Sequence, residues 1–203
     1  MISANRLILT RLASFQAPQL AAIGSNLEIA ELASQRIQLP SLVKVGQTFS
    51  IHDNDVLNEI SFDKLANVNG DFYIGGNAAL SKVLASQFPA LENIGGTLQI
   101  DGNSISEISL PQLKRVEGAI FVRAASNFDC DSLKVMTTGV VLGETRCGSD
   151  IAMPNAPASD SSKDTQTRKV EEKHQGPPAP TNGSRKREAG FASLFACFFF
   201  MLF

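Results

Sequence analysis

The sequence predicts a mainly β fold, a parallel β-solenoid of about five to six coils, followed by a disordered tail. Two observations lead to this prediction. An apolar pattern recurs with a period near 23 residues through the first two thirds of the chain, and the composition changes abruptly after Asp150. The pattern is anchored on leucines that are 22, 23, 26 and 22 residues apart. These anchors are Leu20, Leu42, Leu65, Leu91 and Leu113.

Each anchor is followed by apolar residues at constant offsets. An aliphatic residue comes three positions later, and an apolar pair comes seven and nine positions later. The pairs are Leu27/Ile29, Phe49/Ile51, Phe72/Ile74, Leu98/Ile100 and Ile120/Val122. All twenty frame positions are apolar in a chain that is 43% hydrophobic, and the agreement expected by chance is on the order of 10⁻⁷. Alternating apolar residues predict strands with one buried face, and the long period predicts stacked coils.

The turns of each coil have their own pattern. Glycines follow the anchors by four or five residues, where we expect sharp turns with positive φ. Asn54, Asn77 and Asn103 come twelve residues after three of the anchors. We expect these asparagines to adopt left-handed turns and to form a ladder that hydrogen-bonds to the backbone of neighbouring coils. The 26-residue coil carries its extra residues at 85–87, which predicts a bulging loop there.

A sixth, partial coil is predicted from Leu133, Met136, Val140 and Leu142. The last coil of a solenoid needs a cap, because it would otherwise expose apolar surface and an unpaired strand edge. Cys130 and Cys147 flank this coil. We expect a disulfide between them, worth about 3 kcal/mol, if the protein enters an oxidising compartment. Two buried free thiols are the alternative in a reducing compartment.

The C-terminal quarter resembles an attachment signal for a glycosylphosphatidylinositol (GPI) lipid. Residues 148–187 are rich in Pro, Ser, Thr, Lys and Glu and are predicted to be a disordered linker. Residues 188–203 form the hydrophobic end of the signal, and its thirteen-residue apolar run at 191–203 is only about 20 Å long as a helix, short of the membrane core. Small residues, a polar spacer and an apolar end together predict lipid attachment at Asn182, with Gly183 and Ser184 as alternatives.

The beginning of the chain does not fit a secreted protein as well. Residues 1–17 are predicted to be a partial N-terminal segment, and residues 18–147 the solenoid domain. The short apolar run at Leu7 is broken by Arg11, which makes a poor signal peptide. We therefore expect a surface location provided that a signal peptide missing from this sequence exists upstream.

Candidate catalytic and metal-binding residues are few. His52 lies beside Asp53 and Asp55, but one histidine with short-range carboxylates makes a weak metal site, and we expect a hydrogen-bonded surface turn. His174 falls in the predicted linker. In the coils anchored at Leu42, Leu65 and Leu91, no two carboxylates share a position at ten or eleven residues past the anchors. We therefore predict no catalytic residue, no metal and no cofactor, and the net charge of −2 argues against a nucleic-acid partner.

The coils have the form Pro-x-Leu-x-x-Val/Ile-x-Gly, then apolar-x-Ile and Asn, most clearly over residues 39–110. Together with the closing segment Phe-Asp-Cys-Asp-Ser-Leu at 128–133 and the tail, this pattern resembles the receptor L-domain-like (leucine-rich-repeat-like) repeats of fungal GPI-anchored cell-wall organisation proteins. The resemblance implies a right-handed β-helix at the cell surface that contributes to wall organisation, with no known catalysis. It implies wall polysaccharides or wall proteins as partners and membrane attachment through the GPI lipid.

Members of that family are usually longer and heavily glycosylated. Here the one Asn-x-Ser/Thr acceptor sequence is the triplet that begins at Asn182. Three functions therefore remain as hypotheses: a surface structural or interaction protein, a carbohydrate-active β-helix enzyme, and an intracellular protein anchored by a retained C-terminal tail.

Overall fold

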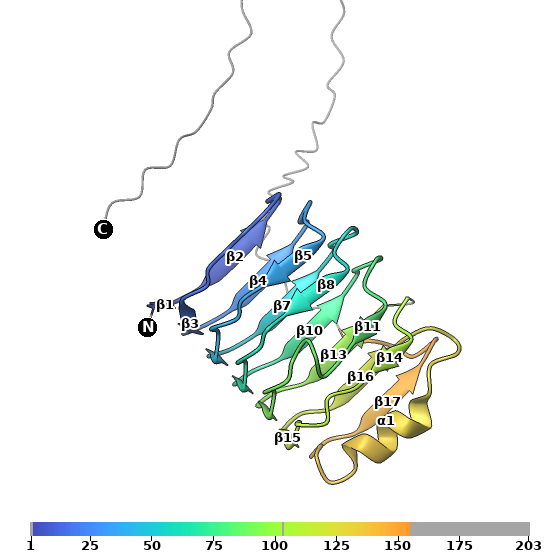
Figure 1. Ribbon diagram of the computed structural model, residues 1–203. Coiled ribbons are helices and arrows are strands. Elements are labelled where there is room, and N and C mark those ends of the chain that lie inside the picture. Colours follow the sequence, from blue (N-terminus) through green and yellow to red (C-terminus); the bar gives the residue numbers. More distant parts are fainter. Residues whose placement is uncertain (1, 103, 155–203) are drawn as a thin grey trace, which may run out of the picture. The chain divides into compact units, whose positions relative to one another are not determined.

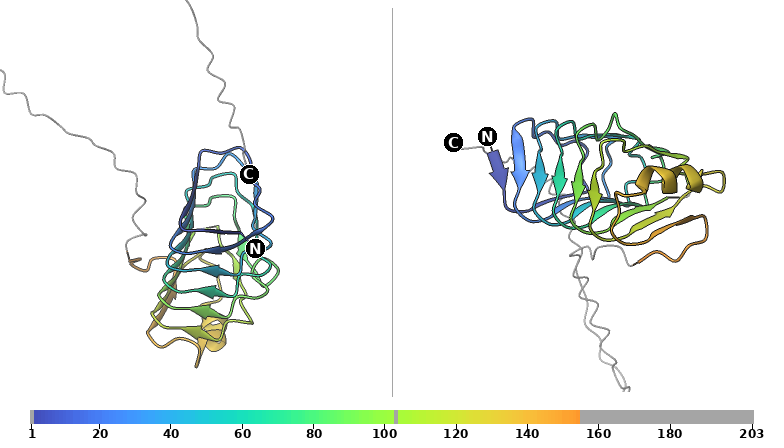
Figure 2. Two further views of the ribbon diagram at one scale, coloured as in Figure 1. Left: turned by 90° about the vertical axis from the view of Figure 1, so that its left-hand side faces the viewer. Right: turned by 90° about the horizontal axis from the view of Figure 1, so that it is seen from below.

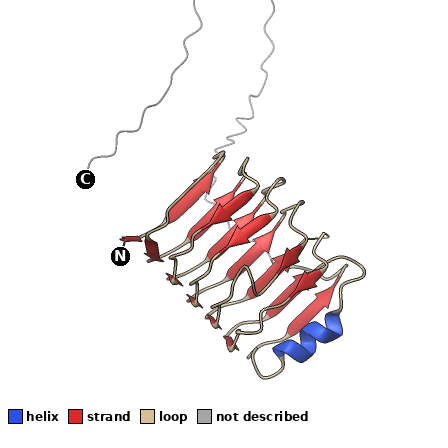
Figure 3. Cartoon of the chain, in the orientation of Figure 1, coloured by secondary structure: helices blue, strands red, loops and turns tan. Residues whose placement is uncertain are grey.

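The protein is a stack of coils in the computed structural model, which describes residues 2–102 and 104–154 (Figure 1). The predicted fold class is confirmed. The described residues are mainly β, their strands pair in parallel, and one short helix lies at the end of the stack (Figure 3).

Two large parallel sheets run along the stack, as the side views show (Figure 2). The seven-stranded sheet consists, in spatial order, of β17 (Thr145–Gly148), β16 (Ile120–Arg123), β13 (Leu98–Asp101), β10 (Phe72–Gly75), β7 (Phe49–His52), β4 (Leu27–Ala30) and β2 (Leu7–Thr10). The six-stranded sheet consists of β1 (Ile2–Ala4), β3 (Leu20–Ile23), β6 (Lys44–Val45), β9 (Asn67–Val68), β12 (Asn93–Ile94) and β15 (Arg115–Val116). Two strand pairs close the coils, namely β5 (Arg36–Gln38) with β8 (Glu59–Ser61) and β11 (Lys82–Val83) with β14 (Glu107–Ile108).

The repeated frame determines the strand register. Phe72 pairs with Phe49 on one side and Leu98 on the other, and Ile74 pairs with Ile51 and Ile100. All twenty frame positions are buried and are at most 9% exposed. Equivalent residues of neighbouring coils thus stack on one another to form a continuous core.

Four phenylalanines form an aromatic cluster inside the middle coils. Phe49 stacks on Phe72 with ring centroids 4.6 Å apart, and Phe62 stacks on Phe88 at 5.4 Å. Phe88 belongs to the long coil, directly after a turn at the expected position, 85–87. The extra residues therefore leave the sheets in register and insert one more ring into the core.

The turn glycines are present for a reason other than the predicted one. Positive φ occurs, among the glycines described, at Gly76, Gly139 and Gly148, and not at the repeated turn positions. A Cβ atom on Gly46 would lie 2.0 Å from the carbonyl oxygen of Gly24. Close contact between the backbones of successive coils, and not a left-handed conformation, therefore requires glycine in this column.

The stack begins earlier than predicted. Strands β1 and β2 pair with β3 and β4, so that both large sheets extend to the N-terminal residues described. The boundary predicted at Pro18 is therefore wrong as the start of the coils. Residues 1–17 include a further coil in which Leu9 is 3% exposed. This coil was not predicted, because its leucines are spaced more closely than those of the repeated pattern.

The last coil has a different register from the predicted one. Residues Cys130–Thr137 form helix α1 instead of a strand turn. Val141 bridges Val116, and Thr145 pairs with Ile120, so the frame resumes five residues later than predicted. Leu142 was expected in the core but is 63% exposed, whereas Leu133, which belongs to the helix, is buried.

Candidate interaction face

The outward side chains of the seven-stranded sheet form what we call the outer face. They alternate along each strand with the buried frame residues, at six, eight and ten positions past the anchors. The residues that matter below are Asn26, Glu28, Thr48, Ser50, His52, Asp71, Tyr73, Gln99, Asp101, Phe121 and Arg123. The outer face is thus rich in hydroxyl, amide and carboxylate groups and carries two aromatic rings.

Tyr73 lies flat on the middle of the outer face. A Cβ atom on Gly75 would meet the Tyr73 hydroxyl oxygen at 2.2 Å, so the ring occupies the space above this glycine. Burial, followed by the negative charges of Asp101 and Asp53, raises the pKa of Tyr73 to about 12. The phenol therefore remains protonated over the whole physiological range and can act as a hydrogen-bond donor.

Asp101 and Arg123 form a bidentate ion pair across β13 and β16. Arg123 Nε donates to Asp101 Oδ1 at 2.7 Å, and Nη2 donates to Oδ2 at 2.6 Å. The hydrogen bonds to Asp101 raise the pKa of Arg123. This planar pair fixes both side chains at one end of the outer face.

Glu28, His52 and Asp53 form a second polar cluster. His52 Nδ1 lies 3.0 Å from Asp53 Oδ2, and His52 Nε2 lies 3.6 Å from Glu28 Oε1. The prediction of a surface turn at His52 is wrong, because His52 is the last residue of β7 and only 8% exposed. Two buried polar atoms, Ser50 Oγ and His52 Nε2, have no hydrogen-bond partner in the described part of the chain.

Two pockets adjoin on the outer face and share Asp71. The larger, about 290 Å³, is lined by Arg6, Asn26, Glu28, Thr48, Ser50 and Asp71. The smaller, about 150 Å³, is lined by Asp71, Tyr73, Thr97, Gln99, Phe121 and Pro154. Gln99 Nε2 donates to the Pro154 carbonyl at 3.1 Å, so the segment after β17 returns to this part of the sheet.

The asparagines at the coil corners hydrogen-bond between coils. Asn54 Oδ1 accepts from the Leu32 N–H at 2.9 Å, and its Nδ2 donates to the Ile29 carbonyl at 3.1 Å. Asn77 makes the equivalent bonds one coil later, with the Asn54 N–H and the Ile51 carbonyl. Asn103, the next predicted member of the ladder, lies outside the described residues.

The left-handed conformation is one position earlier than expected. Positive φ is found at Arg11, Glu31, Asp53 and Gly76, with values of 53° to 63°, and not at Asn54 or Asn77. These four residues occupy the same position in successive coils. The asparagines therefore satisfy backbone groups of the preceding coil, while the residue before each of them makes the turn.

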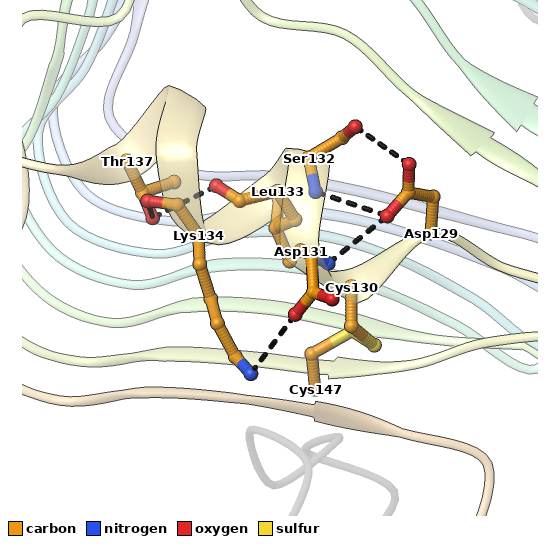
Figure 4. The surroundings of a disulfide bond; sticks show 8 residues. All are labelled: Asp129, Cys130, Asp131, Ser132, Leu133, Lys134, Thr137 and Cys147. Atoms are coloured by element: carbon orange, nitrogen blue, oxygen red, sulfur yellow. Dashed lines mark hydrogen bonds and ion pairs between the residues drawn. A yellow bond between two sulfur atoms is a disulfide. The ribbon is translucent and has the colours of Figure 1, made fainter.

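A disulfide joins Cys130 to Cys147, with Cα atoms 5.7 Å apart (Figure 4). Cys130 is the first residue of α1, and Cys147 is the inward residue of β17 that pairs with Val122. Asp129 caps the helix by accepting from the N–H groups of Asp131 and Ser132 at 3.0 Å each. The bonds from Ser132 lower the pKa of Asp129. The helix and the disulfide thus form the C-terminal cap of the stack.

The remaining predicted sites are not placed. Asn182, Gly183 and Ser184 lie outside the described residues, as do His174 and the apolar end. Within residues 2–102 and 104–154, no helix is long and apolar enough to cross a membrane. In the same residues, no three His, Cys, Asp or Glu side chains come together in a way that could hold a metal ion.

The outer face itself was missed from the sequence. The prediction about acids used positions ten and eleven past the anchors, whereas Glu28 and Asp71 project at positions eight and six. The polar residues that lie between the buried frame positions could have revealed the face. They form a pattern when equivalent positions of successive coils are compared with one another.

Three relatives connect the chain to known proteins. Sporulation-specific protein 2 of Saccharomyces cerevisiae is 33% identical over 108 residues, which are 53% of this chain and 21% of that protein. A cell surface GPI-anchored protein of Arthroderma benhamiae is 32% identical over 112 residues, which are 55% and 28% of the two chains. Cell wall mannoprotein PST1 of S. cerevisiae is 31% identical over 198 residues, or 95% and 42%.

The chain thus spans between about a fifth and two fifths of the length of these relatives. No family model matches it, and no solved structure matches it at a significant level. The relatives nevertheless include proteins named for the fungal cell wall and for a GPI anchor, and the described residues form a β-solenoid. The predicted resemblance to fungal GPI-anchored cell wall proteins is therefore confirmed, and the chain is homologous to them.

Proposed function

We propose that the chain is a GPI-anchored structural and interaction protein that contributes to the organisation of a fungal-type cell wall. In this proposal the solenoid presents the outer face to wall polysaccharides or wall proteins, and lipid attached at Asn182 holds the chain to the plasma membrane. The observation that carries the proposal is a rigid, capped stack of coils in a chain whose relatives are named as wall and GPI-anchored proteins.

The structure of the coils supports display in preference to catalysis. Successive backbones are in contact along the glycine column, and equivalent core residues stack directly. Such a scaffold holds surface side chains in fixed positions, which favours recognition of an extended partner. On the outer face, Ser50 Oγ and His52 Nε2 are not hydrogen-bonded to each other, as a nucleophile and its base commonly are, which supports display over catalysis.

The anchor is tested by placing the full chain behind a working signal peptide in a fungal cell. We expect surface protein that phosphatidylinositol-specific phospholipase C releases. Replacing Asn182 and Gly183 by tryptophan should abolish release and retain the protein inside the cell, because the transfer site needs small residues. The matched control replaces Thr165 and Gln166 by tryptophan and should leave release unchanged.

Two results would change the proposal. A protein that is integrated with its tail intact and resists the phospholipase would favour the tail-anchored alternative. Sugars released from purified wall polysaccharide during incubation with the protein would favour the enzyme alternative. Lengthening the apolar end by about seven leucines should convert the signal into a membrane span and supplies a positive control for integration.

A further inference from the structure

Two polar atoms on the outer face are buried and have no hydrogen-bond partner in the described part of the chain, although His52 Nε2 lies 3.6 Å from Glu28 Oε1. Ser50 is 4% exposed and His52 is 8% exposed, yet Ser50 Oγ and His52 Nε2 make no hydrogen bond. An unsatisfied buried polar atom costs about 1–3 kcal/mol, and one that persists in a native fold requires an explanation. A hydroxyl oxygen and an imidazole nitrogen can each donate or accept, and both are suited to ligand hydroxyl groups.

Ser50 lines the larger of the two adjoining pockets, next to Glu28 and Asp71. The smaller pocket continues from Asp71 toward Tyr73, Gln99 and Phe121. Taken together, the two pockets fall within the range of ordinary ligand sites, about 300–1,000 Å³. They run across β4, β7, β10 and β13, which is the direction in which the coils stack.

The polar groups at the wall of this groove are held in place before any ligand arrives. Asn26 Oδ1 accepts from the Thr48 N–H at 3.2 Å, and Asp71 Oδ1 accepts from the Thr97 N–H at 2.8 Å. In each case, a side chain six residues past an anchor is fixed by the backbone of the following coil. Side chains that are already ordered lose little entropy on binding.

The chemistry of the lining identifies the ligand class. The carboxylates of Glu28 and Asp71 stand among hydroxyl and amide groups, together with the guanidinium of Arg6, which lies 4.0 Å from Glu28 Oε2. Two carboxylates against one guanidinium leave this pocket with net negative charge, which disfavours a polyanion. The rings of Tyr73 and Phe121 supply apolar surface beside these polar groups. A pyranose ring has hydroxyl groups at its edge and C–H groups on its faces, and matches such a combination.

The geometry of the stack adds a length match. Neighbouring strands of a sheet are about 4.8 Å apart, which is close to the length of one pyranose residue in an extended β-linked chain. A linear saccharide lying along the groove would therefore present one sugar to each coil.

We propose that the outer face between β4 and β16 is a binding groove for a linear, neutral oligosaccharide, with Ser50 as a hydrogen-bonding residue and Tyr73 and Phe121 as the apolar platform. The inference rests on the proposed function only in that a wall supplies such polysaccharides. A hydroxyl group of the saccharide satisfies Ser50 Oγ.

The test is isothermal titration of the full chain with a hexasaccharide of β-1,3-linked glucose, with the chitin hexasaccharide and heparin as parallel probes. We expect at least one of the two neutral probes to bind. Ser50→Ala should raise the Kd at least fivefold while it leaves the melting temperature unchanged or raises it, because the substitution removes an unsatisfied buried hydroxyl. Ser81→Ala, an exposed serine on another side of the coils, is the matched control and should leave the Kd unchanged.

Opposite shifts in affinity and stability distinguish a binding residue from a structural one. Binding of heparin alone, no binding of either neutral probe, or an unchanged Kd for Ser50→Ala would each overturn the groove. Phospholipase release in cells is measured separately. If the protein is released but binds neither neutral probe, the groove proposal fails and the proposed function stands. If the protein binds a neutral probe but is not released, the groove proposal stands and the lipid anchor fails.

Discussion

Asn54 and Asn77 hold equivalent positions in successive coils, and the side-chain oxygen of Asn77 accepts from both the backbone N–H and the Nδ2 of Asn54, at 3.1 and 2.9 Å. Asn54 has no exposed surface. Each asparagine satisfies an N–H and a carbonyl group of the coil before it, so the pair links three coils through side-chain bonds alone.

Replacing Asn54 by alanine should lower the free energy of unfolding by about 2–4 kcal/mol, because the Leu32 N–H and the Ile29 carbonyl lose their partners inside the protein. Urea unfolding followed by circular dichroism measures the change. Asn58→Ala is the control, since Asn58 is exposed, and should shift stability by no more than about 0.5 kcal/mol. Equal effects of the two substitutions would contradict a structural role for the ladder.

Replacing Ile74 by aspartate should unfold the solenoid. Ile74 is 2% exposed and stacks between Ile51 and Ile100, so the carboxylate would be buried without a partner, at a cost comparable with the whole stability of a domain. Circular dichroism and size-exclusion chromatography report the loss of the fold. Val56→Asp places the same charge at a residue that is 44% exposed and should remain folded.

Removing the disulfide should loosen the C-terminal cap first. Replacing Cys130 and Cys147 together by alanine should cost about 3 kcal/mol, and amide hydrogen exchange should accelerate in β17 before it accelerates in β10, because β17 has a strand neighbour on one side only in the described stack. Peptide mapping without reductant provides the check on the starting protein. Two cysteines that react freely with an alkylating agent would show that the bond is absent.

Tyr73 should be deprotonated two pH units later than an exposed tyrosine. It is the one tyrosine of the chain, so its ionisation can be followed by ultraviolet absorbance without interference. A titration midpoint near pH 12 is expected, against about 10 in urea. A midpoint near 10 in the folded protein would contradict the burial of the phenol.

The same shift affects stability at alkaline pH. The folded state holds the proton more tightly than the unfolded state, so the stabilisation is fully present below about pH 10 and is lost as the pH rises toward 12. It amounts to at most about 3 kcal/mol. The Tyr73→Phe variant should not show this part of the stability loss at alkaline pH. It serves as the control because any loss that remains in the variant comes from other titratable groups.

The architecture could be predicted because it depends on a repeated local rule. Period-2 apolar pairs such as Phe72 and Ile74 specify a strand, and stacking of identical positions specifies the register. The cap could not be predicted in the same way. The apolar residues of 133–142 fit the strand frame by chance, whereas Asp129 and Ser132 supply a helix cap that takes precedence over it.

The outer face depends on contacts that no single coil contains. Ser50 and His52 are ordinary polar residues in the sequence, and their missing partners become visible only when Glu28 of the preceding coil and Tyr73 of the following coil are placed beside them. Likewise, Gly75 has no evident role until the ring of Tyr73 is seen to occupy its space. The functional surface of a solenoid is formed by residues of several repeats, so no single sequence motif contains it.

The bond between Cys130 and Cys147 also has a mechanical consequence. A pull on the chain beyond Gly148 acts first on β17, and the covalent link transmits it directly to the start of α1, seventeen residues earlier in the sequence. The segment between the two cysteines therefore cannot be drawn out while the bond is intact. In the proposed attachment through the tail, the stack is thus covalently closed at the end that bears the load.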